Sequence, residues 1–211
     1  MSVDHQLYRA AMSRLPTGVT ILSARGADRH ELMTAGAVVS VSLEPTLLLA
    51  SVGLDSHWLQ AVRSSRRFAV NILAAQHEPL ANRCADKARH DQPDRIDALG
   101  ATVSPESGLL ILEDALAVAE CRVHTEYVAG DHALVIGEVE AVRINHTSSE
   151  PLVFFDRRFT TVPTEHDRME PHSGSRLAAR PPPAALRRRR RVIAPYQTRY
   201  QRWMKMWRAA G

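Results

Sequence analysis

The chain has 211 residues, a hydrophobic content of 45% and a net charge of +4, values typical of a globular protein with a full core. No apolar run is long enough for a membrane span, and the first residues do not resemble a secretory signal. Cys84 and Cys121 stand in no CxxC or Cys/His spacing, so we expect no metal site and two reduced, buried thiols in a cytoplasmic protein. GxGxxG and GxxxxGK motifs are absent, which excludes the usual dinucleotide-binding and P-loop sites.

Charge divides the chain into two unlike regions. Residues 165–211 carry 12 Lys and Arg against 3 Asp and Glu, a balance of +9, whereas residues 1–164 have a balance of −5. Three successive prolines and five successive arginines in the basic region cannot form a core face, so we expect it to be disordered. The sequence therefore predicts a folded domain over residues 1–164 and a basic tail over residues 165–211.

The first predicted elements are a helix and three strands. Apolar residues at helical spacing predict a helix over residues 5–15, which the Pro16-Thr17-Gly18 turn ends. Apolar and β-branched runs then predict strands at residues 18–24, 32–42 and 46–52. Within them, "MTAGAVVSVSLEP" (residues 33–45) resembles one buried strand ending at a proline.

A helix follows these strands, with Ser56 as its predicted N-cap. It covers residues 57–65 and should turn Trp58, Leu59 and Val62 inward. The next predictions are a strand at residues 67–73, a helix at residues 78–85 with Pro79 in its first turn, and a charged surface loop at residues 86–100.

The clearest β signal is a long hairpin. Residues 117–127 alternate between apolar and polar, Gly130-Asp131 forms a turn, and residues 132–144 return. Residues 151–162 supply a last strand or pair of strands. Six or more strands without regular βαβ alternation predict a mainly β protein, an antiparallel barrel with a few short helices.

Hydroxyl side chains occupy unexpected positions in residues 33–45. A segment that only fills a core would carry Val or Ile where this one carries Thr34, Ser40 and Ser42. Such hydroxyls either bind a ligand or form hydrogen bonds with nearby backbone, and each serine alone leaves both roles open.

Five segments resemble, in the same order, the flavin reductase family with the FMN-binding split-barrel fold. They are "RLPTGVTILSA", "TAGAVVSVSLEPTLLLASV", "FAVNIL", "CRVHTEYVAGDHALVIGEV" and "PLVFFDRRF". The resemblance covers roughly residues 7–160, and the "AGDH" and "FDRRF" segments are most similar to reductases that serve antibiotic-pathway oxygenases of the actinorhodin type. The basic tail matches nothing in that pattern.

The resemblance implies an NAD(P)H-dependent flavin reductase. Such a protein supplies reduced flavin to a separate monooxygenase and is expected to be a homodimer with a Greek-key split barrel. FMN is the expected flavin, with FAD or riboflavin as alternatives, and NADH or NADPH is the reductant. The alternatives are a pyridoxamine-phosphate-oxidase-like enzyme on the same barrel, or a flavin-binding protein whose basic tail engages acidic partners or nucleic acid. We rank an irregular end of the reading frame above nucleic-acid binding as the explanation of the Pro- and Arg-rich composition of that tail.

The resemblance also implies which residues hold the flavin. The strand after the "TGV" turn should lie along the isoalloxazine ring, and the elements that follow should hold the phosphate through neutral donors. The expected flavin-binding residues are Thr17, Thr34, Ala35, Gly36, Ala37, Ser40, Val41, Ser42, Ser51, Ser56, His57, Asn71, Phe155 and Arg158.

Three details qualify this set. The family's Ala-Ser-Ser-Phe is replaced here by residues 35–38, Ala-Gly-Ala-Val, which removes donors and leaves Gly36 to bring its backbone N–H close to the ring. Trp58 stands where the family has another hydroxyl. The resemblance implies that Phe155 and Arg158 lie beside the flavin across the dimer interface; the alternative is that Phe155 and Phe159 are core residues and Arg157 and Arg158 a solvated pair.

His132 is the candidate catalytic residue. Without the resemblance, it would be a solvent-exposed histidine at the end of a hairpin. The family's Gly-Asp-His pattern, intact at Gly130, Asp131 and His132, implies contact with nicotinamide or flavin. Hydride transfer between two cofactors needs no protein acid or nucleophile, so the protein is expected to contribute stacking and orientation.

Overall fold

A computed structural model of the chain describes residues 3–86, 100–145 and 149–163. The tail over residues 165–211 and most of the segment predicted as a surface loop lie outside the described residues. The helices are α1 (His5–Met12), α2 (His57–Ser65), α3 (Glu78–Ala85) and the short 3₁₀ helix η1 (Ala75–His77). The strands are β1 (Thr17–Gly18), β2 (Thr20–Arg25), β3 (His30–Ala35), β4 (Val38–Leu43), β5 (Thr46–Gly53), β6 (Arg67–Ile72), β7 (Ala101–Val103), β8 (Leu110–Leu112), β9 (Ala117–Ala129), β10 (His132–Ile144), β11 (Leu152–Phe155) and β12 (Arg158–Thr161).

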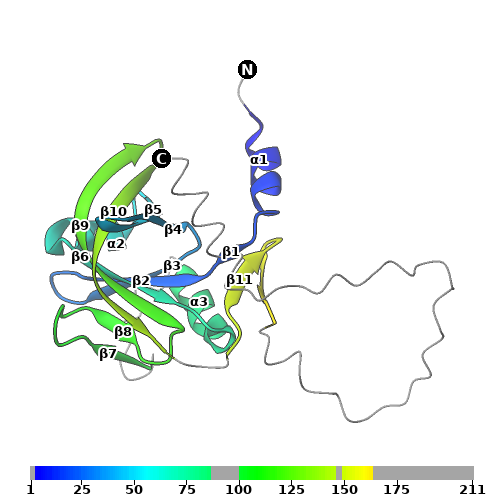
Figure 1. Cartoon of the computed structure of the whole chain (residues 1–211). Helices are drawn as coiled ribbons and strands as arrows, with labels where there is room; N and C mark the ends of the chain where they lie inside the picture. The colour runs from blue at the N-terminus through cyan, green and yellow to red at the C-terminus, as the bar shows by residue number, and fades with distance from the viewer. Residues whose placement is uncertain (1–2, 87–99, 146–148, 164–211) are drawn as a thin grey trace, which may run out of the picture. The chain divides into compact units, whose positions relative to one another are not determined.

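The strands form an antiparallel split barrel, which confirms the predicted fold class (Figure 1). One sheet has seven strands in the order β3-β2-β6-β9-β10-β5-β4, and every neighbouring pair is antiparallel. A three-stranded sheet has the order β1-β11-β12, and β7 pairs with β8. Among the described helices, none is long and apolar enough to cross a membrane.

The prediction of one buried strand over residues 33–45 was wrong. The segment divides into β3 and β4, with the break at Gly36 and Ala37. Strand β4 pairs with β5 alone at one end of the sheet, and Val39 is 58% exposed. An end strand has a neighbour on one side only, so the N–H and C=O groups along its outer edge have no partner strand within the sheet.

Other elements agree closely with the prediction. Helix α2 covers the predicted residues, Trp58, Leu59 and Val62 are buried, and the Leu59 N–H donates to Ser56 Oγ at 3.1 Å, which confirms the N-cap. Residues 151–162 form the pair β11 and β12, joined through Asp156 and Arg157 with φ of 49° and 64°. Positive φ at both central residues is what a tight two-residue hairpin turn requires.

The core has two parts that share strand β2. Leu22 belongs to a cluster under α2 that contains Trp58 and Phe68, whose rings meet edge to face at a centroid distance of 5.4 Å. Ile21, on the opposite face of β2, belongs to a second cluster built with β8 and β11. Both cysteines are buried and outside any disulfide, as predicted, and burial raises the pKa of the Cys121 thiol to about 12.

Gly137 of β10 makes room for an aromatic ring of this core. A Cβ at this position would lie closest to Phe68 Cζ, at 2.8 Å from Phe68 Cε1 and 2.9 Å from Cys121 Cβ. Phe68 and Cys121 are both buried, so neither can move away without disturbing the barrel interior. The Phe68 ring therefore packs against the bare backbone of β10.

We expect Gly137→Ala to lower the free energy of unfolding by about 1–3 kcal/mol, because overpacking a filled core forces side chains and backbone to shift. Gly18→Ala is the matched control, since nothing lies within 4 Å of its added Cβ, and it should cost less than about 0.5 kcal/mol. Urea unfolding of both variants measures the difference. Equal unfolding midpoints for the two variants would contradict this packing.

Candidate functional site

A cavity of about 780 Å³ opens where four segments of the barrel meet. Strand β3 contributes Met33 and Thr34, the connection from β5 to α2 contributes residues 53–57, the end of α3 contributes Cys84 and Ala85, and the start of β10 contributes Asp131 and His132. Four of the residues expected from the sequence thus share one wall: Thr34, Ser56, His57 and His132. The volume lies within the range of about 300–1,000 Å³ typical of small-molecule pockets.

Strand pairing brings the two most polar segments of this wall together. His132 is the Cα partner of Gly53 in the ladder between β10 and β5. Leu54, the residue after Gly53, donates its N–H to the carbonyl oxygen of Asp131, the residue before His132, at 3.0 Å. The β9–β10 turn and the β5–α2 connection are therefore joined by backbone hydrogen bonds, which fixes the position of His132 relative to Ser56.

His132 forms a side-chain pair with its neighbour Asp131. The imidazole Nδ1 lies 2.7 Å from Asp131 Oδ1, and the His132 side chain is 48% exposed. The hydrogen bond from His132, followed by the charge of that residue, lowers the pKa of Asp131 below its ordinary value. Asp131 is therefore a hydrogen-bond partner of the candidate catalytic residue, a pairing that the sequence analysis did not assign.

The cavity hydroxyls differ in what they can still offer a ligand. Thr34 Oγ1 donates its proton to the Ala81 carbonyl oxygen at 2.7 Å, so it can only accept a further hydrogen bond. Ser56 Oγ accepts from the first turn of α2, which leaves its proton available to an anion. Ser56 therefore fits the expected role of phosphate donor, and Thr34 does not.

A second group of expected residues lies around the break between β3 and β4. A Cβ on Gly36 would come within 2.7 Å of Thr17 Oγ1, so the glycine allows Thr17 to approach this bend. Ala35, just before it, accepts a hydrogen bond from Thr20 through its carbonyl oxygen. The Ser51 N–H donates to the Ala37 carbonyl oxygen at 2.9 Å. Because Ser51 and Gly53 alternate with buried Val52, this group continues along the face of β5 that carries the cavity-lining Gly53.

Ser40, Val41 and Ser42 lie on the end strand β4, outside the residues that line the cavity. The register between β4 and β5 shifts between Ser40 and Ser42, so Val41 occupies a bulge. Ser42 Oγ accepts a hydrogen bond from the Glu44 N–H at 3.2 Å. Any contact between a flavin and these three residues would therefore be made at the open edge of the sheet.

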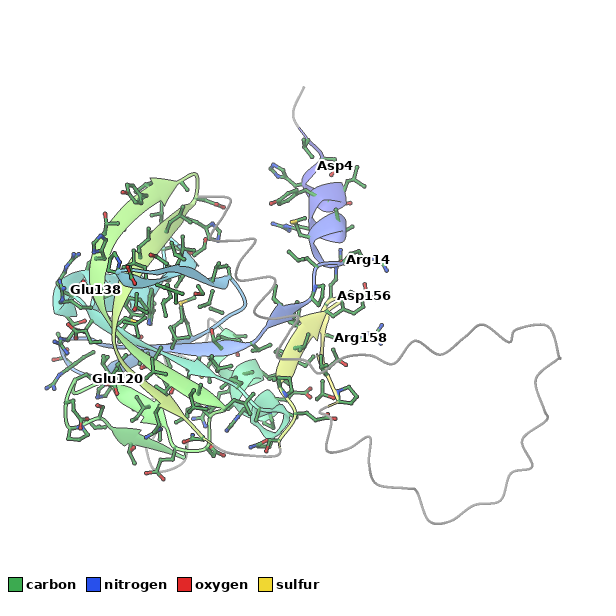
Figure 2. The ribbon with its side chains drawn as sticks, viewed as in Figure 1. Asp4, Arg14, Glu120, Glu138, Asp156 and Arg158 are labelled. Carbon is green, nitrogen blue, oxygen red and sulfur yellow. The ribbon has the colours of Figure 1, made fainter. Side chains whose placement is uncertain are left out.

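Phe155 and Arg158 close the β11–β12 hairpin and do not line the cavity. Arg158 Nη2 lies 3.6 Å from Asp156 Oδ2 within the same turn, and its side chain is 75% exposed (Figure 2). Phe155 is 38% exposed. The Arg158 guanidinium is thus accessible, although it shares a carboxylate with Arg14, whose Nε lies 3.9 Å from Asp156 Oδ1.

Asn71 is an expected residue whose polar side-chain atoms the barrel interior already uses. Its Nδ2 donates to the Ile21 carbonyl oxygen at 3.1 Å, and its Oδ1 accepts from the Leu112 N–H at 2.8 Å. The residue is 1% exposed and does not line the cavity. Asn71 joins β2, β6 and β8, and we leave it out of the flavin site. Trp58, at the position where the family has another hydroxyl, is likewise a core residue.

Sequence reasoning missed several residues of the cavity wall. Asp55 immediately precedes the N-cap of α2, and Met33 adjoins Thr34 on β3, so position beside an expected residue was the available signal. Cys84 and Ala85 carried no such signal, because only the folded chain brings the end of α3 to this wall.

Comparison with known proteins agrees with this geometry. A family model described as a flavin reductase like domain matches residues 12–163. The chain belongs to the flavin reductase family. The actinorhodin polyketide dimerase of Streptomyces coelicolor is 38% identical to this flavin reductase over 164 residues, which cover 77% of this chain and 89% of that protein. The expected resemblance to the actinorhodin type is thereby confirmed.

Two further relatives of this flavin reductase carry reductase names. The NADH-dependent FMN reductase AsuE2 of Streptomyces nodosus subsp. asukaensis is 37% identical over 158 residues, covering 74% of this chain and 83% of its own. The NADH:FAD oxidoreductase SgcE6 of Streptomyces globisporus superposes with a TM-score of 0.70 at 32% identity, covering 78% of this chain and 98% of its own.

We expect Asn71→Ala to lower the free energy of unfolding by about 2–4 kcal/mol, because it leaves the Leu112 N–H and the Ile21 carbonyl buried without partners. Ser40→Ala, at an exposed hydroxyl, is the matched control and should cost less than about 0.5 kcal/mol. Urea unfolding gives the stabilities, and flavin titration below the unfolding range gives the dissociation constants. A folded Asn71→Ala protein that had lost flavin affinity would return Asn71 to the site.

Proposed function

We propose that this flavin reductase oxidises NADH, transfers the hydride to a freely exchanging flavin, and releases the reduced flavin to a separate monooxygenase in the cytoplasm. The observation that carries the proposal is the convergence of His132, Ser56 and His57 on one cavity in a chain of this family. Relatives named as NADH-dependent FMN and FAD reductases support NADH over NADPH. BorF, a structural neighbour with a TM-score of 0.71 and 30% identity, is the flavin reductase component of a two-component tryptophan halogenase, which supports a separate oxygenase partner.

The start of α2 offers a place for the flavin phosphate. The first N–H groups of a helix lack partners within it and lie at the positive end of its dipole, so they favour an anion. Ser56 adds a hydroxyl donor, and His57 begins the helix on the cavity wall. Among the described residues that line the cavity, there is no Lys or Arg. Holding a phosphate mainly through neutral donors suits a flavin that must leave again after reduction.

The chain's own residues bind and orient the two ring systems. A flavin and a nicotinamide supply the hydride chemistry when both are bound. His132 lines the cavity, where it can contact the nicotinamide, and Thr17, Gly36 and Ser51 lie around the β3–β4 break, outside the residues that line it. Placing the rings at reacting distance is the main contribution expected of the protein.

Purified protein should oxidise NADH only when flavin is added, and FMN, FAD and riboflavin should be compared as acceptors. The reaction is followed by the loss of NADH absorbance, and reduced flavin that crosses a dialysis membrane to an oxidant on the far side shows release. No NADH oxidation above the buffer rate at saturating flavin would contradict the proposal.

The assay has a matched pair of variants within one helix. Ser56→Ala should raise the KM for flavin roughly 10- to 150-fold, the loss expected for one hydrogen bond of about 1.5–3 kcal/mol to a charged group. Ser65 lies at the other end of α2 and donates to the Ala61 carbonyl oxygen, so Ser65→Ala should leave the KM for flavin unchanged. The assay should be run well below the melting temperature, because removing the N-cap also costs about 1 kcal/mol of stability.

We also propose that the protein is a homodimer formed partly by α1. No residue of α1 is buried, although Leu7 and Met12 are apolar and lie 68% and 47% exposed. A helix this short is not stable in water without tertiary packing. The Asp156 N–H donates to the Ser13 carbonyl oxygen at 2.8 Å, which anchors only the end of the segment. A second copy would cover the apolar face, together with the exposed Val39 of β4.

Leu7→Glu should weaken association of the protein, whereas Gln6→Glu, on the opposite face of α1, should not. Sedimentation velocity over a range of concentrations measures the dimer dissociation constant for both variants.

Truncation after Val162 should leave a folded, active dimer, since the basic tail lies beyond the residues that match the family. A monomeric wild-type protein would contradict the proposed dimer. A truncated protein without flavin binding would contradict the division of the chain into a folded domain and a dispensable tail.

A further inference from the structure

We propose that Asp131 is a positioning residue for hydride transfer: its carboxylate holds His132 with the proton on Nδ1, so that Nε2 accepts a hydrogen bond from the carboxamide N–H of the nicotinamide. This inference rests on the proposed function and adds a second residue to it. Asp131 acts through His132 and has no direct contact with the reacting atoms in this scheme.

The chemistry of the pair determines the tautomer. An ionised carboxylate can only accept hydrogen bonds, so an imidazole nitrogen 2.7 Å from it must be the donor. A neutral imidazole has one N–H, and placing it on Nδ1 leaves a lone pair on Nε2. The carboxylate is ionised near neutral pH because the ordinary pKa of an aspartate is about 4, and the hydrogen bond with His132 lowers the pKa of Asp131 further. Nε2 is then an acceptor, and a primary amide offers it a matching donor.

The backbone around the pair is fixed on both sides. Gly130 takes a φ of 65°, which glycine adopts without strain, and so allows the tight turn that places Asp131 before β10. His132 pairs with Ala129 on one side and Gly53 on the other. The Asp131 carbonyl oxygen accepts from the Leu54 N–H, as described above. Asp131 therefore holds the β5–α2 connection through its backbone and His132 through its side chain.

The pair lies at the cavity wall and not on a remote surface. Asp131 and His132 both line the cavity, and Asp55, His57 and Cys84 are the other ionisable residues among those that line it. His5 also lowers the pKa of Asp131 through its charge. Because the Asp131 side chain is 94% exposed, its contact with His132 contributes little to folding stability. Its effect is the direction and protonation of the imidazole.

The test compares Asp131→Ala, His132→Ala and the double variant by kcat/KM for NADH at saturating FMN. Asp131→Ala should lower kcat/KM about three- to tenfold, the equivalent of one weakened hydrogen bond. The same change should have no further effect when His132 is already alanine, because residues that act through one group are not additive. Asp131→Asn, which keeps an oxygen acceptor, should restore part of the rate. Asp28→Ala, at an exposed aspartate outside the cavity, is the matched control and should leave kcat/KM unchanged.

Two readouts separate positioning from a structural role. In wild-type protein, ¹⁵N NMR of the imidazole should show the proton on Nδ1, and this preference should be lost in Asp131→Ala. The melting temperature and the flavin dissociation constant should stay close to wild type, with a melting-temperature change within about 2 °C.

The failures of the two proposals are distinguishable. Absence of flavin-dependent NADH oxidation by wild-type protein overturns the proposed function and this inference together. An active wild-type protein in which the two alanine changes multiply independently, or in which the imidazole proton lies on Nε2, overturns this inference alone.

Discussion

The double pairing of β10 determines where the site lies. Residues His132–Glu138 are bonded to β9 on one side and to β5 on the other, so the start of β10 must meet the end of β5. A slip of one residue would move His132 away from Gly53 and turn Ala133 and Val135 out of the barrel interior. The Phe68 ring beneath Gly137 opposes such a slip, because no other residue of β10 lacks a Cβ. Core packing thus fixes the geometry of a surface cavity.

The hydroxyls of the opening strands serve two purposes that the sequence does not distinguish. Thr34 donates a hydrogen bond to a carbonyl oxygen of α3 and so attaches β3 to α3. Ser56 accepts a hydrogen bond as the N-cap of α2, and its hydroxyl can still donate one. Thr20, which was never a candidate, donates to the carbonyl oxygen of Ala35 inside the barrel. Residue type alone indicates that a hydroxyl needs a partner. The fold decides whether that partner is the chain itself or a ligand.

The sequence correctly predicted those elements that are determined by residues close to one another in the chain. The cap at Ser56, the inward Trp58 and Leu59, and the hairpin through Gly130 each depend on residues a few positions apart. The break at Gly36 was missed because the apolar pattern runs through it and only pairing with β5 turns β4 into an end strand. The interior hydrogen bonds of Asn71 could not be predicted because Leu112, the donor to its amide oxygen, lies 41 residues away in the sequence. Cys84 reached the cavity by helix packing, which periodicity does not reveal.

Ser56 belongs both to the fold, as the N-cap of α2, and to the lining of the cavity. Ser56 accepts from the Leu59 N–H through its Oγ and also lines the cavity where we propose that an anion binds. A ligand that orders this hydroxyl also orders the first turn of α2, whose amides otherwise open by fraying. Helix α2 in turn contributes Trp58 and Leu59 to one core cluster. Amide hydrogen exchange at the start of α2 is therefore a direct measure of occupancy, and it is readable even when the bound molecule undergoes no chemistry.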